Sequence, residues 1–122
     1  MIIDHLGIVV SNYAHSKDFY TQCLAPLGIL LIVEHEGWAG FGCAGKPDFW
    51  FGPDGEAHIP MHIAFVAEDR ASVDQFYQAG ISAGGKDNGA PGLRTMYHPH
   101  YYGAFLIDPD GHNIEAVCHK AE

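Results

Sequence analysis

The sequence is short of basic residues and of long apolar runs, and we expect no secretory leader. Only 6 lysines and arginines stand against 15 aspartates and glutamates, so the formal net charge is −9 at pH 7. Nucleic acids and anionic membranes attract basic surfaces, so neither is an expected partner. No apolar run approaches the ~20 residues that a transmembrane helix needs. No basic segment followed by an apolar stretch and a cleavage site marks a signal peptide.

Paired cysteines are also missing. Cys23, Cys43 and Cys118 lie far apart and form no CxxC pair, so neither a disulfide framework nor a thiolate zinc site is expected. We therefore predict a protein of the reducing cytoplasm. What the chain does have is 9 histidines and 48% hydrophobic residues in 122 positions, enough for one folded domain with its own core.

The sequence contains an internal repeat. His5-Leu-Gly-Ile-Val-Val-Ser-Asn opens the first half and His62-Ile-Ala-Phe-Val-Ala-Glu-Asp opens the second. At the same offset, Phe19-Tyr20 matches Phe76-Tyr77. A repeat of this length indicates one supersecondary unit used twice. We predict a single α+β domain over residues 1–122, made of module one (1–52), a linker (53–59) and module two (60–122).

Each module is predicted to have the order βαβββ, from the alternation of apolar residues in strands and their helical spacing between them. The expected elements of module one are a strand at 2–10, a helix at 13–25 and strands at 29–35, 38–43 and 47–52. Those of module two are a strand at 61–67, a helix at 70–79 ended by Gly80, a short strand at 81–86 and a hairpin of 101–107 with 113–118. The glycine-rich segment 84–94 is either a mobile lid or a static irregular turn.

One carboxylate lies in an apolar strand and needs a partner. Glu115 is surrounded by Asn113-Ile-Glu-Ala-Val117, and an unpaired buried charge would be costly. A divalent metal held by His5, His62 and Glu115 would supply that partner, with coordination positions left for substrate. The ligand set suits Fe, Mn, Ni or Zn. The competing interpretation is two ordinary core histidines and a glutamate that faces solvent.

The segment 94–102 is rich in polar and aromatic side chains. It is either an aromatic surface loop or part of the site, since loops often carry function. In the second case His100 and Tyr102 are candidate acid–base groups. Arg94, His98 and Tyr101 are candidate substrate-binding residues, with Arg94 suited to a substrate carboxylate.

Three stretches together resemble the vicinal oxygen chelate superfamily. They are Asp4-His-Leu-Gly-Ile-Val-Val-Ser, His62-Ile-Ala-Phe-Val66 and Phe105-Leu-Ile-Asp-Pro-Asp-Gly-His-Asn-Ile-Glu-Ala-Val117. That superfamily includes glyoxalase I, extradiol dioxygenases, fosfomycin-resistance proteins and bleomycin-binding proteins. The resemblance implies two βαβββ modules forming an incomplete mixed-sheet barrel around a divalent metal. It also implies that His5, His62 and Glu115 fall on three of the family's ligand positions.

The chain departs from glyoxalase I at the fourth ligand position. Aligning Gly45 with Gly111 puts Phe49 opposite Glu115, where glyoxalase I has a glutamate. The adjacent Asp48 is expected on the opposite face of the strand. We therefore expect a three-ligand site, with Phe49 facing the metal pocket and contacting substrate while most other aromatic residues of module one lie in the core.

The resemblance implies a metal-dependent lyase, isomerase or dioxygenase that binds a small molecule through two neighbouring oxygens, and a homodimer. The modules either close on each other within one chain or pair between chains, in which case His5 of one chain would meet His62 and Glu115 of the other. One alternative is a non-catalytic small-molecule binding or resistance protein of the bleomycin-binding type. A weaker alternative is an interaction module, because a fold does not by itself imply a function.

Overall fold

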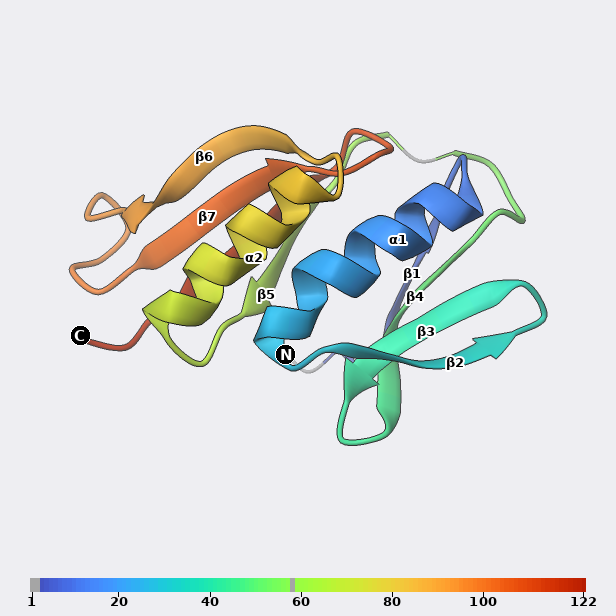
Figure 1. The fold of residues 1–122 in the computed structure, drawn as a ribbon, viewed down its shortest axis with the longest axis horizontal. Coiled ribbons are helices and arrows are strands. Elements are labelled where there is room, and N and C mark those ends of the chain that lie inside the picture. Colours follow the sequence, from blue (N-terminus) through green and yellow to red (C-terminus); the bar gives the residue numbers. More distant parts are fainter. Residues whose placement is uncertain (1–2, 58) are drawn as a thin grey trace.

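The computed structural model describes residues 3–57 and 59–122, and the predicted repeat is confirmed (Figure 1). Module one consists of β1 (Leu6–Val9), α1 (Tyr13–Leu24), the short 3-10 helix η1 (Ala25–Leu27), β2 (Leu30–His35), β3 (Trp38–Cys43) and β4 (Lys46–Gly52). Module two consists of β5 (His62–Val66), α2 (Arg70–Ser82), β6 (Lys86–Leu93), β7 (Tyr102–Ile107) and β8 (Asn113–Cys118). The first strand is shorter than the predicted 2–10, and Ile2 lies outside the described residues.

The strands form two separate four-stranded sheets of mixed direction. Their orders are β1-β4-β3-β2 and β5-β8-β7-β6, with a parallel pair at one edge of each. Within the described residues no strand of one sheet pairs with a strand of the other, so β1 and β5 are both edge strands. The predicted α+β architecture with incomplete barrel modules is confirmed. None of the described helices is long and apolar enough to cross a membrane.

Both helices begin at side-chain caps in equivalent places. Asn12 accepts a hydrogen bond from the backbone N–H of His15 at the start of α1, and Asp69 accepts one from Ser72 at the start of α2. α2 does not end at Gly80, as predicted, but continues to Ser82. A Cβ at Gly80 would lie 2.2 Å from Leu106 Cδ1, so glycine here lets the helix pack closely on β7. The glycine signalled close packing rather than a helix end.

The segment 84–94 is neither a lid nor an irregular turn. Most of it forms β6, which pairs antiparallel with β7 with register shifts around Gly89 and Gly92. The strand also contains Pro91, which an edge strand tolerates because one side of its backbone has no partner. The Gly and Pro content that obscured this strand in the sequence is compatible with its place at the sheet edge. The short strand expected at 81–86 is instead the end of α2 and the approach to β6.

The helices lie side by side on the same side of the two sheets (Figure 1). Between the helices and sheets is one continuous core of aromatic and aliphatic side chains. It crosses the module boundary, since the rings of Phe49 and Phe65 lie 5.3 Å apart between centroids. Because strand side chains alternate, every second residue points to the opposite face of its sheet, where none of the described helices packs and where the pockets described below lie.

A buried polar contact also joins the modules. The Tyr20 hydroxyl on α1 donates to Asp108 Oδ2 at 2.5 Å, and Asp110 Oδ1 accepts from the backbone N–H of Ser11 at 3.0 Å. Asp108 is itself buried and accepts from the backbone N–H of His112. The Asp-Pro-Asp-Gly turn of module two is therefore also an attachment point for the first helix of module one.

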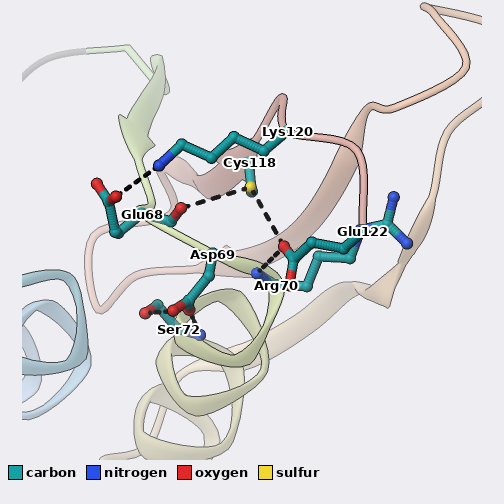
Figure 2. A network of polar contacts seen from close by, with 7 residues as sticks. All are labelled: Glu68, Asp69, Arg70, Ser72, Cys118, Lys120 and Glu122. Atoms are coloured by element: carbon teal, nitrogen blue, oxygen red, sulfur yellow. Dashed lines mark hydrogen bonds and ion pairs between the residues drawn. The ribbon is translucent and has the colours of Figure 1, made fainter.

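The C-terminal residues attach to the start of α2 (Figure 2). Glu122 Oε2 accepts from the backbone N–H of Arg70 at 2.8 Å, where a carboxylate is favoured by the helix dipole. Lys120 pairs with Glu68 at 2.5 Å across the same corner. These contacts fix the end of β8, the strand that carries Glu115.

Candidate functional site

Two pockets open on the helix-free faces, one in each module. The Glu115 pocket has a volume of about 490 Å³ and is lined by His62, Tyr97, Tyr101, Phe105, Asn113 and Glu115. The tryptophan pocket has a volume of about 410 Å³ and is lined by His5, Gly7, His35, Glu36, Trp38, Trp50 and Asp54. The two have no lining residue in common, so the predicted site residues are divided between them.

His62 and Glu115 meet in the Glu115 pocket. They stand on the parallel neighbours β5 and β8, and His62 Nε2 lies 3.1 Å from Glu115 Oε1. Glu115 is only 1% exposed, whereas the imidazole is half-exposed toward the pocket. The structure thus brings together two of the three predicted metal ligands.

The second nitrogen of His62 faces a backbone acceptor. Nδ1 lies 3.1 Å from the backbone carbonyl of Asn113, which can only accept, so Nδ1 carries a proton. A neutral imidazole in this tautomer presents the lone pair of Nε2 to a carboxylate oxygen. Two acceptors at that distance need a cation between them, either a proton or a metal ion. The imidazole and the carboxylate are both groups that could hold a divalent metal, and a metal-binding histidine commonly has its other ring nitrogen bonded to such a carbonyl.

Tyr101 holds the other oxygen of Glu115. Its hydroxyl donates to Glu115 Oε2, and its ring lines the pocket where the sequence predicted a substrate-binding residue. Burial, followed by the hydrogen bond to Glu115, raises the pKa of Tyr101 well above its usual range. The phenol therefore stays protonated at neutral pH and remains a donor. The ring of Phe105 lies alongside that of His62, with 6.2 Å between ring centroids and 27° between the ring planes.

His5 is not part of this group within one chain. Its ring lines the tryptophan pocket, is largely exposed and contacts Asp4 through Nδ1 at 2.7 Å. Residues 3–57 and 59–122 contain no group of three or more His, Cys, Asp or Glu side chains placed to hold a metal. A single chain therefore does not assemble the predicted triad.

The prediction for Phe49 is wrong, and the reason is a β-bulge. Phe49 is 3% exposed and packs in the core against Tyr20, 5.1 Å away between centroids, while the next residue, Trp50, faces the pocket. In the β3–β4 pairing, Phe41 lies opposite Phe49 but Gly42 lies opposite Pro47, which leaves Asp48 as an extra residue. Such an insertion reverses the alternation of side chains beyond it.

Trp50 is consequently the structural counterpart of Glu115. It pairs with Gly7 on β1 as Glu115 pairs with Ala64 on β5. Trp38 lines the same pocket and is not part of the core. Glu36 and Asp54 also line it, and the sequence did not single out either residue. The bulge in β4, which the pattern of residues does not reveal, is the reason that Trp50 rather than Phe49 faces the pocket.

Of the segment 94–102, Tyr101 alone reaches Glu115. Tyr102 points to the other face of the sheet, where its hydroxyl donates to Asp74 on α2 at 2.6 Å, so it is not an acid–base group of this pocket. Its strand position next to Tyr101 explains the reversal. His100 is seen only to donate its backbone N–H to His98 Nδ1.

Arg94 and His98 do not line the pocket but contact residues that do. The Arg94 guanidinium lies over the Phe105 ring, 5.4 Å from its centroid, and donates to the carbonyl of Ala90. His98 packs edge-on against Tyr101 and lies 2.7 Å from His119 through its Nε2. Both residues support pocket residues and stand outside the pocket lining.

Comparison with known proteins places the fold and the family. The chain superposes on a glyoxalase/bleomycin resistance protein from Albidiferax ferrireducens T118 with a TM-score of 0.84 and 28% identity, covering 94% of this chain and 97% of that one. A glyoxalase/bleomycin resistance protein/dioxygenase family enzyme from Burkholderia phytofirmans PsJN gives 0.73 and 19%, covering 98% and 100%. A glyoxalase-related enzyme from Fulvimarina pelagi gives 0.72 and 15%, covering 97% and 88%. No protein of curated function matches the sequence.

The sequence profile of the Glyoxalase/Bleomycin resistance protein/Dioxygenase superfamily matches residues 2–116, nearly the whole chain. The match spans both modules, including His5, His62 and Glu115. The chain belongs to this superfamily.

Proposed function

We propose that the protein is a metal-dependent enzyme of the vicinal oxygen chelate type. One observation carries the proposal: His62 Nε2 lies 3.1 Å from Glu115 Oε1 inside an open pocket, while its other ring nitrogen is occupied by the backbone carbonyl of Asn113. A divalent ion, Fe, Mn, Ni or Zn, would satisfy both groups. His5 is the third proposed ligand.

We further propose that His5 comes from a second copy of the chain. The shared core, with Phe49 against Phe65 and the buried bond from Tyr20 to Asp108, holds the modules in the arrangement that separates His5 from His62. Closing the modules on each other within one chain would break these contacts. A two-fold dimer that pairs module one of one copy with module two of the other keeps them, and creates two equal sites. The outer edges of β1 and β5, which have no strand partner among the described residues, favour such an assembly.

The bound metal would act as a Lewis acid on two neighbouring substrate oxygens, which suits isomerisation, elimination, addition or oxygenation. The residues of this chain have supporting roles. Tyr101 holds one oxygen of Glu115 by a hydroxyl that stays protonated, so the other oxygen remains directed at His62. The carbonyl of Asn113 faces Nδ1 of His62, and the ring of Phe105 lies alongside the imidazole. These contacts orient the ligands before substrate arrives.

Metal analysis of purified protein tests the proposal. We expect bound divalent metal in the wild-type protein and a loss of most of it in His62→Ala and in Glu115→Ala. His100→Ala is the matched control, because this histidine is exposed and stands outside the pocket lining. Full retention of metal by both ligand variants would overturn the assignment and favour the non-catalytic alternative.

A further inference from the structure

Trp50 stands in module one where Glu115 stands in module two. Trp50 pairs with the β1 residue two positions after His5, and Glu115 pairs with the β5 residue two positions after His62. His5 also lines the same pocket as Trp50. In a site that takes His5 from one copy and His62 with Glu115 from another, position 50 is therefore the module-one strand position beside the metal.

The indoles of Trp38 and Trp50 form a wall over this part of the sheet. A Cβ at Gly40 would lie 2.9 Å from the Trp50 ring, so this ring lies over β3. A Cβ at Gly52 would lie 2.4 Å from Trp38 Cδ2 and one at Gly7 would lie 3.9 Å from its ring, so the Trp38 indole extends over β4 toward β1. The nitrogen of an indole bears a proton and can only donate, so the indole wall offers a flat apolar surface and no metal ligand.

The two pockets are also poor in positive charge. Among the described residues that line them, neither pocket has a lysine or an arginine. Glu36 and Asp54 instead add carboxylates to the tryptophan pocket. Arg94 lies over the Phe105 ring outside the lining, and Lys46 pairs with Asp4. Because a phosphate or carboxylate group is usually held by basic side chains, a site made of these two pockets disfavours a substrate that carries one.

We propose, resting on the function proposed above, that Trp38 and Trp50 determine the substrate specificity of the shared site. The indole wall takes the place that a second carboxylate would have in module one, so the metal keeps only three protein ligands and positions for two substrate oxygens. The rest of the substrate is a flat body without a charged group, and it lies against the indoles. Contacts between flat π-systems contribute beyond the burial of apolar area, which favours such a body over a small aliphatic one.

Two chelators with different bodies test the indole wall. Tropolone presents two neighbouring oxygens on a flat ring, and acetohydroxamic acid presents a similar pair on a small aliphatic body. We would titrate each into the full-length protein loaded with Zn²⁺, by calorimetry, and divide its affinity by its affinity for aqueous Zn²⁺. On this scale the wild-type protein should prefer tropolone by at least about tenfold.

Leucine variants show whether the indoles cause that preference. Trp38→Leu and Trp50→Leu should each lose part of it, and the double variant most of it, because leucine is apolar but has no flat π-face. The single variants keep the test decisive if the double variant does not fold. A wild-type protein without the preference, or leucine variants that retain it in full, would overturn the proposed specificity.

Trp50→Glu tests whether position 50 stands beside the metal. The variant gives module one a counterpart of Glu115 and should raise the affinity for Zn²⁺ at least about tenfold, because a further carboxylate adds a ligand and a negative charge. It should also weaken the binding of both chelators, which lose a coordination position. Trp38→Glu is the matched control, since β4 separates β3 from β1 in the sheet, and it should raise the affinity far less. Equal gains in the two variants, or no gain at position 50, would overturn the placement.

The zinc content separates a failure of the indole wall from a failure of the metal site. A wild-type protein that holds no zinc, or that holds as much after Glu115→Ala, would overturn the proposed function and the role of the wall with it. Zinc that is held through Glu115, with chelator affinities that do not respond to either tryptophan, would overturn the role of the wall alone.

Discussion

The two modules have the same strand order and the same face available for a ligand, yet they present different chemistry there. At the equivalent strand position module one has Trp50 and module two has Glu115. A glycine in the sheet leaves room for the Trp50 indole. The Glu115 carboxylate instead contacts the side chains of His62 and Tyr101. A duplicated unit can thus keep its topology while one copy presents a buried carboxylate at this position and the other a tryptophan.

The largest expected effect separates Phe49 from its neighbour Trp50. Phe49→Ala should lower the free energy of unfolding by about 3–5 kcal/mol, since it removes a buried ring from the core shared by the modules. Trp50→Ala should cost less, because the indole faces a pocket. Urea denaturation of both variants measures the difference. The reverse order would mean that the bulge at Asp48 is misplaced and that Phe49 faces the pocket after all.

An intermediate effect is expected at the bond that joins the modules. Tyr20→Phe leaves Asp108 Oδ2 buried without its donor and should destabilise the protein by about 2 kcal/mol. Tyr13→Phe is the matched control: it removes a phenol that donates to the exposed Glu34, and should cost about 0.5 kcal/mol or less. Thermal or urea unfolding tests the pair. Equal losses would show that the bond between Tyr20 and Asp108 does not secure the modules.

The smallest effect concerns the helix caps and depends on pH. The hydrogen bonds from Ser72 hold the pKa of Asp69 below its ordinary value of 3.8, whereas the cap of α1 is the uncharged Asn12. A carboxyl whose pKa is lowered by folding stabilises the folded state above its unfolded pKa, and this contribution is lost as the pH falls through the folded pKa.

Asp69→Asn gives α2 the same kind of cap as α1. The variant should therefore be slightly less stable than the wild type at neutral pH, and the difference should shrink below about pH 4. Urea midpoints at several pH values measure it. A difference that grows with acidification would contradict the assignment of the cap.

Much of the fold was predictable from the sequence because the repeat and the alternation of apolar residues are local signals. The C-terminal end of α2 and the course of β6 were not, since Gly80 reflects packing against Leu106 and β6 is a Gly- and Pro-containing edge strand. Both depend on contacts with elements elsewhere in the chain. Local propensity contains no information about them.

For the candidate site, the sequence predicted His62 and Glu115 as two of three ligands and Tyr101 as one of several substrate-binding candidates, and the structure places these three residues in one pocket. It could not predict which neighbour of Asp48 faces outward, because a single inserted residue changes the face without changing the composition. Nor could it place His5, whose distance from the other ligands depends on how the two modules pack.

The central claim is that each metal site takes His5 from one copy and His62 with Glu115 from another. The most direct test mixes His5→Ala with Glu115→Ala, unfolds and refolds them together, and measures bound metal. Each variant alone should hold little. The mixture should regain about a quarter of the wild-type metal, because half of the dimers are mixed and each of these has one intact site. A mixture that holds no more metal than the separate variants would contradict the shared site.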